Sequence, residues 1–160
     1  AARGRAVFQP GNENLQAWAL SVLFWGVLVA WLGPAVLAFL VLQAALAYSL
    51  LSAANYVEHY GLLRARGADG RYERPDPRHS WNSNRVVSNL LLYQLQRHSD
   101  HHAWPARRYQ ALRHFDASPQ LPTGYFGMFL LALLPPLWRR VMDPRVLAHV
   151  EGDRARLNLG

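Results

Sequence analysis

Residues 15–54 read LQAWALSVLFWGVLVAWLGPAVLAFLVLQAALAYSLLSAA, and this stretch contains no charged side chain. Gly33-Pro34 divides it into two apolar runs, 15–32 and 35–54. A helix needs about 20 apolar residues to cross the core of a bilayer, so each run is long enough or nearly so. The break leaves room only for a tight turn. The stretch therefore predicts a helical hairpin in a membrane, with spans at about 15–32 and 35–60. The alternative is a pair of buried helices in a soluble protein.

Arginines lie outside this hairpin on both sides. Arg3 and Arg5 precede it, Arg64 and Arg66 follow it, and the turn carries no charge. Positively charged residues favour the cytoplasmic side of a membrane. We therefore expect both ends of the hairpin to lie in the cytoplasm.

The overall charge of the 160-residue chain restricts its partners. Lys and Arg number 17 against 10 Asp and Glu, which gives +7 and suits either a nucleic acid or a membrane surface. The apolar runs favour the lipid bilayer and speak against nucleic acid. The chain has no cysteine, so disulfides, cysteine-type zinc sites and thiolate-held iron–sulfur clusters are excluded.

Three of the seven histidines fall within five residues, at His98, His101 and His102. Positions spaced i, i+3 and i+4 share one face of a helix. The apolar residues before them have the same spacing: Val87, Leu90, Leu91, Gln94 and Leu95. The pattern predicts one helix over 85–102, capped by Ser83 or Asn84, with its histidines facing the core. Because buried unpaired polar groups are costly, convergent imidazoles indicate a transition-metal site. A surface patch of histidines is the alternative.

His59 lies at the end of the second apolar run, and Gly61 is a candidate stop for that helix. An ionisable residue at the mouth of a membrane helix indicates a functional site, so His59 is the natural fourth ligand. Four residues are candidates for outer contacts with the imidazoles: Asn55, Glu58, Asp100 and His79. His114 is expected to pack a loop, and His149 to lie on the surface.

The remaining segments complete an all-α single domain, with an integral membrane hairpin followed by a cytoplasmic histidine-bearing region over about 61–160. The polar segment 64–80 is expected to fold the histidine helix back toward His59. Residues 124–134 are apolar but too few to span a membrane, which predicts an interfacial or core-packing helix. Pro144 is expected to open a short helix in the tail.

Several motifs resemble those of one family. Residues 55–61, NYVEHYG, and residues 95–102, LQRHSDHH, resemble the N-Y-x-E-H-Y-G element and the last histidine box of the bacterial integral-membrane alkane 1-monooxygenases. Residues 70–74 and 79–84 are also similar to that family, which belongs to the membrane fatty-acid desaturase and hydroxylase superfamily. The resemblance runs from about residue 10 to about residue 155.

The resemblance implies a non-haem di-iron enzyme that converts medium-chain n-alkanes to 1-alkanols with dioxygen and electrons from rubredoxin. It implies the bacterial inner membrane, with the site on the cytoplasmic side. It also makes iron ligands of His59, His98, His101 and His102.

The chain departs from the family in one respect: the two earlier histidine boxes are missing. We therefore expect the C-terminal part of such an enzyme, inactive alone, with the upstream part supplying the other boxes. Two alternatives stay open. One is a fatty-acid desaturase or xylene-type methyl hydroxylase of the same superfamily. The other is a non-enzymatic membrane protein that binds a metal.

Overall fold

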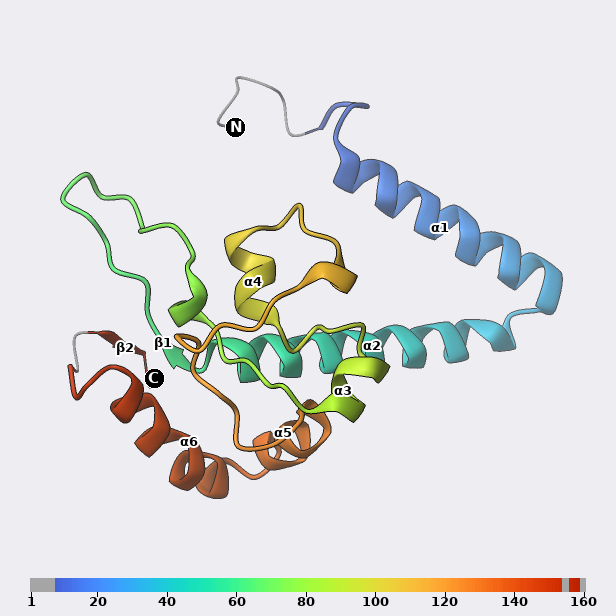
Figure 1. Cartoon of the computed structure of the whole chain (residues 1–160). Coiled ribbons are helices and arrows are strands. Elements are labelled where there is room, and N and C mark those ends of the chain that lie inside the picture. Colours follow the sequence, from blue (N-terminus) through green and yellow to red (C-terminus); the bar gives the residue numbers. More distant parts are fainter. Residues whose placement is uncertain (1–7, 154–155, 159–160) are drawn as a thin grey trace. The chain divides into compact units, whose positions relative to one another are not determined.

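The computed structural model describes residues 8–153 and 156–158 (Figure 1). The described part is mostly helical, as the sequence predicts. Its α-helices are α1 (Glu13–Leu32), α2 (Ala35–His59), α3 (Val86–Leu91), α4 (His98–Ala103), α5 (Tyr125–Ala132) and α6 (Pro135–His149). The described part also contains two short strands, β1 (Gly61–Leu62) and β2 (Leu157–Asn158), and two 3-10 turns, η1 (Pro77–His79) and η2 (Tyr109–Ala111). The chain divides into two compact units, residues 1–50 and 51–160.

The first unit contains α1 and most of α2. The side chain of Asn12 caps α1 by accepting a hydrogen bond from the Asn14 amide at 3.0 Å. Gly33 ends the helix with φ of 87°, a left-handed conformation that glycine adopts without a Cβ penalty. Pro34 then leads into α2.

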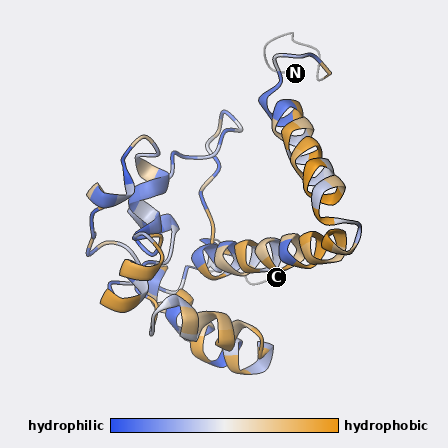
Figure 2. Cartoon of the chain, turned by 90° about the vertical axis from the view of Figure 1, so that its right-hand side faces the viewer, coloured by the Kyte–Doolittle hydropathy of each residue, from blue (hydrophilic) through white to orange (hydrophobic). Residues whose placement is uncertain are grey.

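Both helices are long and apolar enough to cross a membrane, as predicted, at 20 and 25 residues (Figure 2). Among the described residues none of α1 is buried, and only 6% of the most apolar window of α2 is. Helices in the core of a soluble protein are mostly buried, so this exposure argues against that alternative. The membrane orientation stays a prediction, and Arg3 and Arg5, which support it, lie outside the described residues.

The second unit has its own core, to which the last turns of α2 belong. The buried hydrophobic cluster of this core comes from α2, α5, α6 and the loops between: Val57, Tyr60, Trp81, Leu121, Tyr125, Met128, Trp138, Met142 and Val146. The short sheet pairs β1 with β2 in antiparallel register, Gly61 opposite Asn158 and Leu62 opposite Leu157. The apolar segment after Gly124 is the core-packing helix α5, with Tyr125 and Met128 fully buried.

The prediction of one continuous helix over 85–102 is wrong. The chain forms α3 and α4 instead, and Tyr93 and Gln94 between them have φ of 50° and 60°. Left-handed residues in succession stop an α-helix. Neither predicted residue caps α3 by a side-chain bond, because Arg85 occupies the cap position.

The apolar stripe that was expected to face the core is exposed. Val87 and Leu90 are 69% and 76% exposed, whereas Ser88 and Asn89 of the same helix are buried. A hydrogen bond accounts for this orientation: the side-chain amide of Asn89 donates to the Ser83 carbonyl at 3.0 Å. This bond keeps the polar face of α3 turned toward the interior. The apolar stripe and the histidines therefore do not lie on one buried face of a single helix.

The tail also differs from the prediction. α6 begins at Pro135, nine residues before Pro144, and runs through Pro144 to His149. Pro135 and Pro136 lie in the first turn, where an amide N–H has no helical partner to lose. The proline pair that follows α5 thus starts α6.

Candidate metal centre

His59 is the last residue of α2. Gly61, with φ of 74°, ends the helix just beyond it, as predicted. The Nδ1 of His59 lies 3.0 Å from the Asn55 backbone carbonyl. A carbonyl can only accept, so Nδ1 carries the proton and donates it. Nε2 is thereby left with a free lone pair, the state in which a neutral imidazole binds a metal.

The short helix α4 carries His98 and His102 one turn apart, and Asn82 fixes its position. The Asn82 side chain accepts from the Ser99 amide at 3.0 Å and donates to the Ser99 hydroxyl at 2.6 Å. The Ser99 hydroxyl also contacts that of Ser118 at 2.8 Å. All three side chains are buried. This polar network therefore holds the histidine helix against the loops, where the sequence predicted apolar packing.

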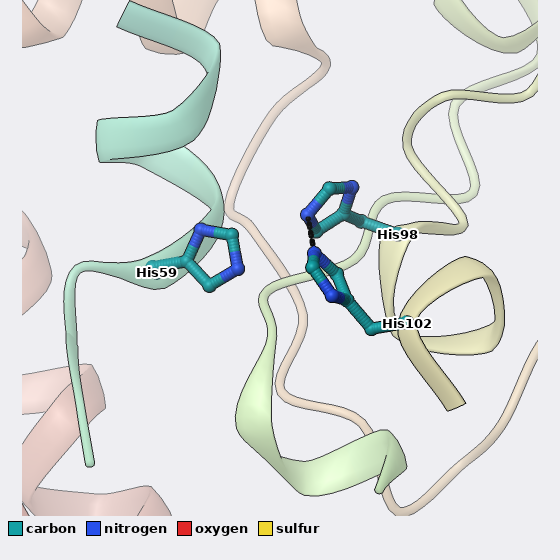
Figure 3. A group of neighbouring side chains, drawn as sticks. All are labelled: His59, His98 and His102. Atoms are coloured by element: carbon teal, nitrogen blue, oxygen red, sulfur yellow. Dashed lines mark hydrogen bonds between the residues drawn. The ribbon is translucent and has the colours of Figure 1, made fainter. Parts of the chain in front are cut away.

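His59, His98 and His102 converge on one point (Figure 3). The His59 ring centroid lies 5.0 Å from that of His98 and 5.1 Å from that of His102. One ring nitrogen from each of the three histidines lies within 4.8 Å of the others. The prediction that residues 64–80 bring His59 back to the histidines of α4 is confirmed.

The surroundings favour neutral rings. Burial, followed by the charges of His102, His59 and His101, lowers the pKa of His98 to about 2. Burial, then His59, His101 and Arg64, also lowers the pKa of His102. Both groups are therefore uncharged at neutral pH and can offer lone pairs.

His101 is the one predicted ligand that does not join this group. Its side chain is exposed, and its ring centroid lies 6.0 Å from that of His98 and 5.8 Å from that of His102. The i, i+3 spacing of His98 and His101 therefore does not bring His101 into the group of three.

The four outer candidates differ in what they contact. Glu58 is buried, and its Oε2 lies 3.2 Å from the Nε2 of His98. Asn55 acts through its backbone carbonyl, as described above. Asp100 is fully buried but accepts from Arg113 and Arg107, and the described residues show no bond from it to an imidazole.

His79, the fourth outer candidate, holds its own loop. Its Nδ1 accepts from the Asp76 amide at 3.0 Å, and its Nε2 lies 2.9 Å from Glu73 Oε1. It also lines a pocket of about 340 Å³ next to the cluster, whose wall includes His59, His102, Arg64 and Tyr72. His149 is not at the cluster: its Nε2 lies 3.0 Å from the Arg78 carbonyl.

Sequence reasoning missed Tyr125 and Gln96. The Tyr125 hydroxyl donates to Glu58 Oε1 at 2.7 Å, and Gln96 is fully buried two residues before His98. Gln96 lies in the histidine motif, which was its available signal. Tyr125 is 67 residues from Glu58, and no local pattern indicates that contact.

The residues present fit a metal ion. Histidine nitrogens bind zinc at about 2.0–2.1 Å, so two of them on one ion are at most about 4.2 Å apart. The observed limit of 4.8 Å needs only a small movement of the rings. The Nε2 atoms of His98 and His102 face each other at 2.7 Å (Figure 3). Three convergent imidazoles in a partly buried site suit iron, copper or zinc.

The sequence of the chain also matches a known protein family. The model of the fatty acid desaturase family matches residues 3–139. The chain belongs to the fatty acid desaturase family. Within it, the chain is 50% identical over 157 residues to an alkane 1-monooxygenase of Acinetobacter baylyi, and 52% identical over 157 residues to one of Pseudomonas putida. Each match covers 98% of this chain but only 38% and 39% of the relative. The chain thus spans about two fifths of the length of these curated relatives.

A more distant family member is the xylene/toluene monooxygenase hydroxylase component of Pseudomonas putida, which is 29% identical over 139 residues. That match covers 85% of this chain and 35% of the relative. The histidine cluster therefore lies in a segment that the chain shares with two kinds of monooxygenase.

Proposed function

We propose that this chain is part of an alkane 1-monooxygenase that hydroxylates the terminal carbon of medium-chain n-alkanes. The observation that carries the proposal is the identity of about one residue in two, along 98% of the chain, with alkane 1-monooxygenases. The lower identity of 29% with the xylene/toluene enzyme makes methyl-arene hydroxylation the second candidate.

We further propose two non-haem iron ions as the metal, with His59, His98, His101 and His102 among their ligands. Bound iron would supply the redox chemistry that activates dioxygen. The exposed position of His101 beside the other three supports a role toward a second ion. Four histidines do not fill two coordination shells, so an upstream part of the same enzyme would supply further ligands.

The chain's own residues would position the reactants. The apolar α2 ends at His59, so a water-insoluble alkane arriving from the bilayer would reach the cluster along this helix. The Asn55 carbonyl and Glu58 hold His59 and His98 in place. The buried side of the cluster limits the access of water.

Rubredoxin is the electron donor in this proposal, and the bacterial inner membrane is the location, with the histidines on the cytoplasmic side. The polar, arginine-rich segment after the hairpin supports this orientation. The pocket lined by Arg64 and Tyr72 opens next to His59 and His102, which gives a donor from the aqueous side a short path to the cluster.

The proposed orientation predicts where the hairpin turn lies. The chain has no cysteine, so a single Leu32→Cys substitution gives one unique thiol. Leu32 is preferable to Gly33, whose φ of 87° disfavours a side chain. In cells, an impermeant maleimide added from the periplasmic side should label this thiol. Arg66→Cys, in the polar loop, is the control and should be labelled only after lysis. The reverse pattern would contradict the topology.

The function itself is tested by product analysis. The protein expressed from its complete reading frame, in cells supplied with rubredoxin and its reductase, should convert octane to 1-octanol. Xylene turned over in preference to octane would favour the second candidate. Metal bound without oxidation of either compound would support the non-enzymatic alternative, and unsaturated acyl chains as product would support a desaturase.

A further inference from the structure

A chain of buried contacts connects α5 to the histidine cluster. The Tyr125 hydroxyl donates to Glu58 Oε1 at 2.7 Å, and Glu58 Oε2 lies 3.2 Å from His98 Nε2. Tyr125 is completely buried, and Glu58 and His98 are 3% and 7% exposed. One carboxylate thus contacts the tyrosine with one oxygen and the histidine ring with the other.

The same tyrosine is attached to the histidine segment by a second route. Its backbone amide donates to the side-chain Oε1 of Gln96 at 3.3 Å. Gln96 is fully buried, and its backbone carbonyl accepts from the Ser83 amide at 3.0 Å. Because Gln96 precedes His98 by two residues, the contacts close a ring that runs through Tyr125, Glu58, His98 and Gln96.

We propose that Tyr125 is a positioning residue of the metal centre, which fixes the Glu58 carboxylate beside the Nε2 of His98, the ring nitrogen that faces His102. This inference rests on the proposed function, because it assigns a role toward the metal that the function requires. Among the described residues, Tyr125 makes no hydrogen bond to the three histidines, so its action is indirect. It comes from α5, outside both histidine motifs.

The physical argument is the scarcity of partners for a buried carboxylate. Among the described residues, Glu58 has only the tyrosine hydroxyl and His98 as side-chain partners. Burial, then the charge and hydrogen bond of Glu58, raises the pKa of Tyr125, so the hydroxyl keeps its proton and remains a donor. Without that donor, Oε1 is unpaired in a buried site and the carboxylate is free to rotate away from the ring. Outer contacts of this kind typically change metal affinity 10–100-fold.

The test compares Tyr125→Phe with the wild type in the full-length protein, loaded with iron and purified in detergent. The measurement is the rate at which an excess of a coloured ferrous chelator removes iron, together with the Mössbauer spectrum of the loaded sample. We expect iron release about tenfold faster and a changed spectrum, whatever the enzymatic activity. In a Glu58→Gln background, the same tyrosine substitution should add little, because both changes break one connection.

Tyr60→Phe is the matched control. Tyr60 belongs to the same core and also donates its hydroxyl to a carboxylate, that of Asp143, at 2.6 Å. Asp143 lies on α6, and the described residues show no contact from it to a histidine of the cluster. Both variants lose one tyrosine hydroxyl and its hydrogen bond to a carboxylate, which is buried for Tyr125 and partly buried for Tyr60. Only Tyr125→Phe should alter iron release and the spectrum.

The outcomes are distinct. Equal release from wild type and Tyr125→Phe would overturn the positioning role, and so would equal acceleration by Tyr60→Phe, because the effect would then be general loosening of the core. Additive effects of Tyr125→Phe and Glu58→Gln would also overturn it. A wild-type protein that binds no iron would instead refute the proposed function and leave no metal for Tyr125 to position.

Discussion

Replacing His98 by alanine is expected to reduce conversion of octane to 1-octanol at least about 100-fold, since even outer contacts of a metal ligand change affinity or activity 10–100-fold. His98 is the most buried of the three converging histidines, and its ring centroid lies 5.0 Å from that of His59 and 4.3 Å from that of His102. Its low pKa keeps it neutral and ready to bind. Alanine removes this ligand and leaves two of the three converging imidazoles.

The measurement is whole-cell turnover combined with the iron content of each purified variant. Alanine at His59 or His102 should have the same effect, because each supplies one of the converging nitrogens. His149→Ala is the control: it loses a contact with the Arg78 carbonyl, away from the cluster, and should keep its iron and its turnover. Near-normal turnover in His98→Ala would defeat the ligand assignment. Loss of activity with full iron content would indicate that His98 acts on a neighbouring group.

His101→Ala tests the one proposed ligand that lies outside the group of three converging histidines. The proposed di-iron centre requires its imidazole, so turnover should fall as in His98→Ala, with part of the iron retained. Its ring already lies about as far from His102 as from His98, at 5.8 and 6.0 Å. Normal turnover in this variant would restrict the site of this chain to the three converging residues.

The sequence predicted what depends on local composition and on short spacings. Two uncharged runs around Gly33-Pro34 give two apolar helices, because length and hydropathy decide that outcome with little help from tertiary contacts. The pair His98 and His102 is also local, since residues one helical turn apart share a face. Even a helix of six residues, as α4 is, preserves that relation.

What the sequence did not predict depends on partners distant in the chain. The stripe from Val87 to Leu95 has helical spacing, but buried bonds of Asn89 and Gln96 turn the chain at Tyr93 and Gln94 and leave the stripe exposed. Periodicity identifies a face of a helix but cannot tell which face the rest of the protein covers. The contacts of Tyr125 with Glu58 and of Arg113 with Asp100 could not be predicted either, because they span 67 and 13 residues.

Asp100 shows how the same motif can serve folding and chemistry with different residues. It lies between two proposed ligands, and the sequence made it a candidate acceptor for an imidazole. In the structure its carboxylate accepts from the Arg113 amide at 2.9 Å and pairs with the Arg107 guanidinium at 3.2 Å. The Arg107 and Arg113 guanidinium groups also lie over the Trp104 ring, at 5.3 and 4.9 Å from its centroid. Asp100 thus anchors the segment that follows α4.

Asp100→Ala is therefore expected to lower the free energy of unfolding by about 3 kcal/mol, the lower end of the range for breaking a buried ion pair by removing one partner. The lower end applies because Arg107 and Arg113 are partly exposed, at 22% and 50%, and regain water when the carboxylate is gone. Thermal unfolding of the full-length protein in detergent, with limited proteolysis within residues 104–116, measures the effect. Asp116→Ala removes a fully exposed carboxylate from the same segment and should leave the unfolding midpoint close to that of the wild type. Below its lowered midpoint, Asp100→Ala should still bind iron. If it unfolded like the wild type but lost its iron, the imidazole-acceptor role expected from the sequence would be the correct one.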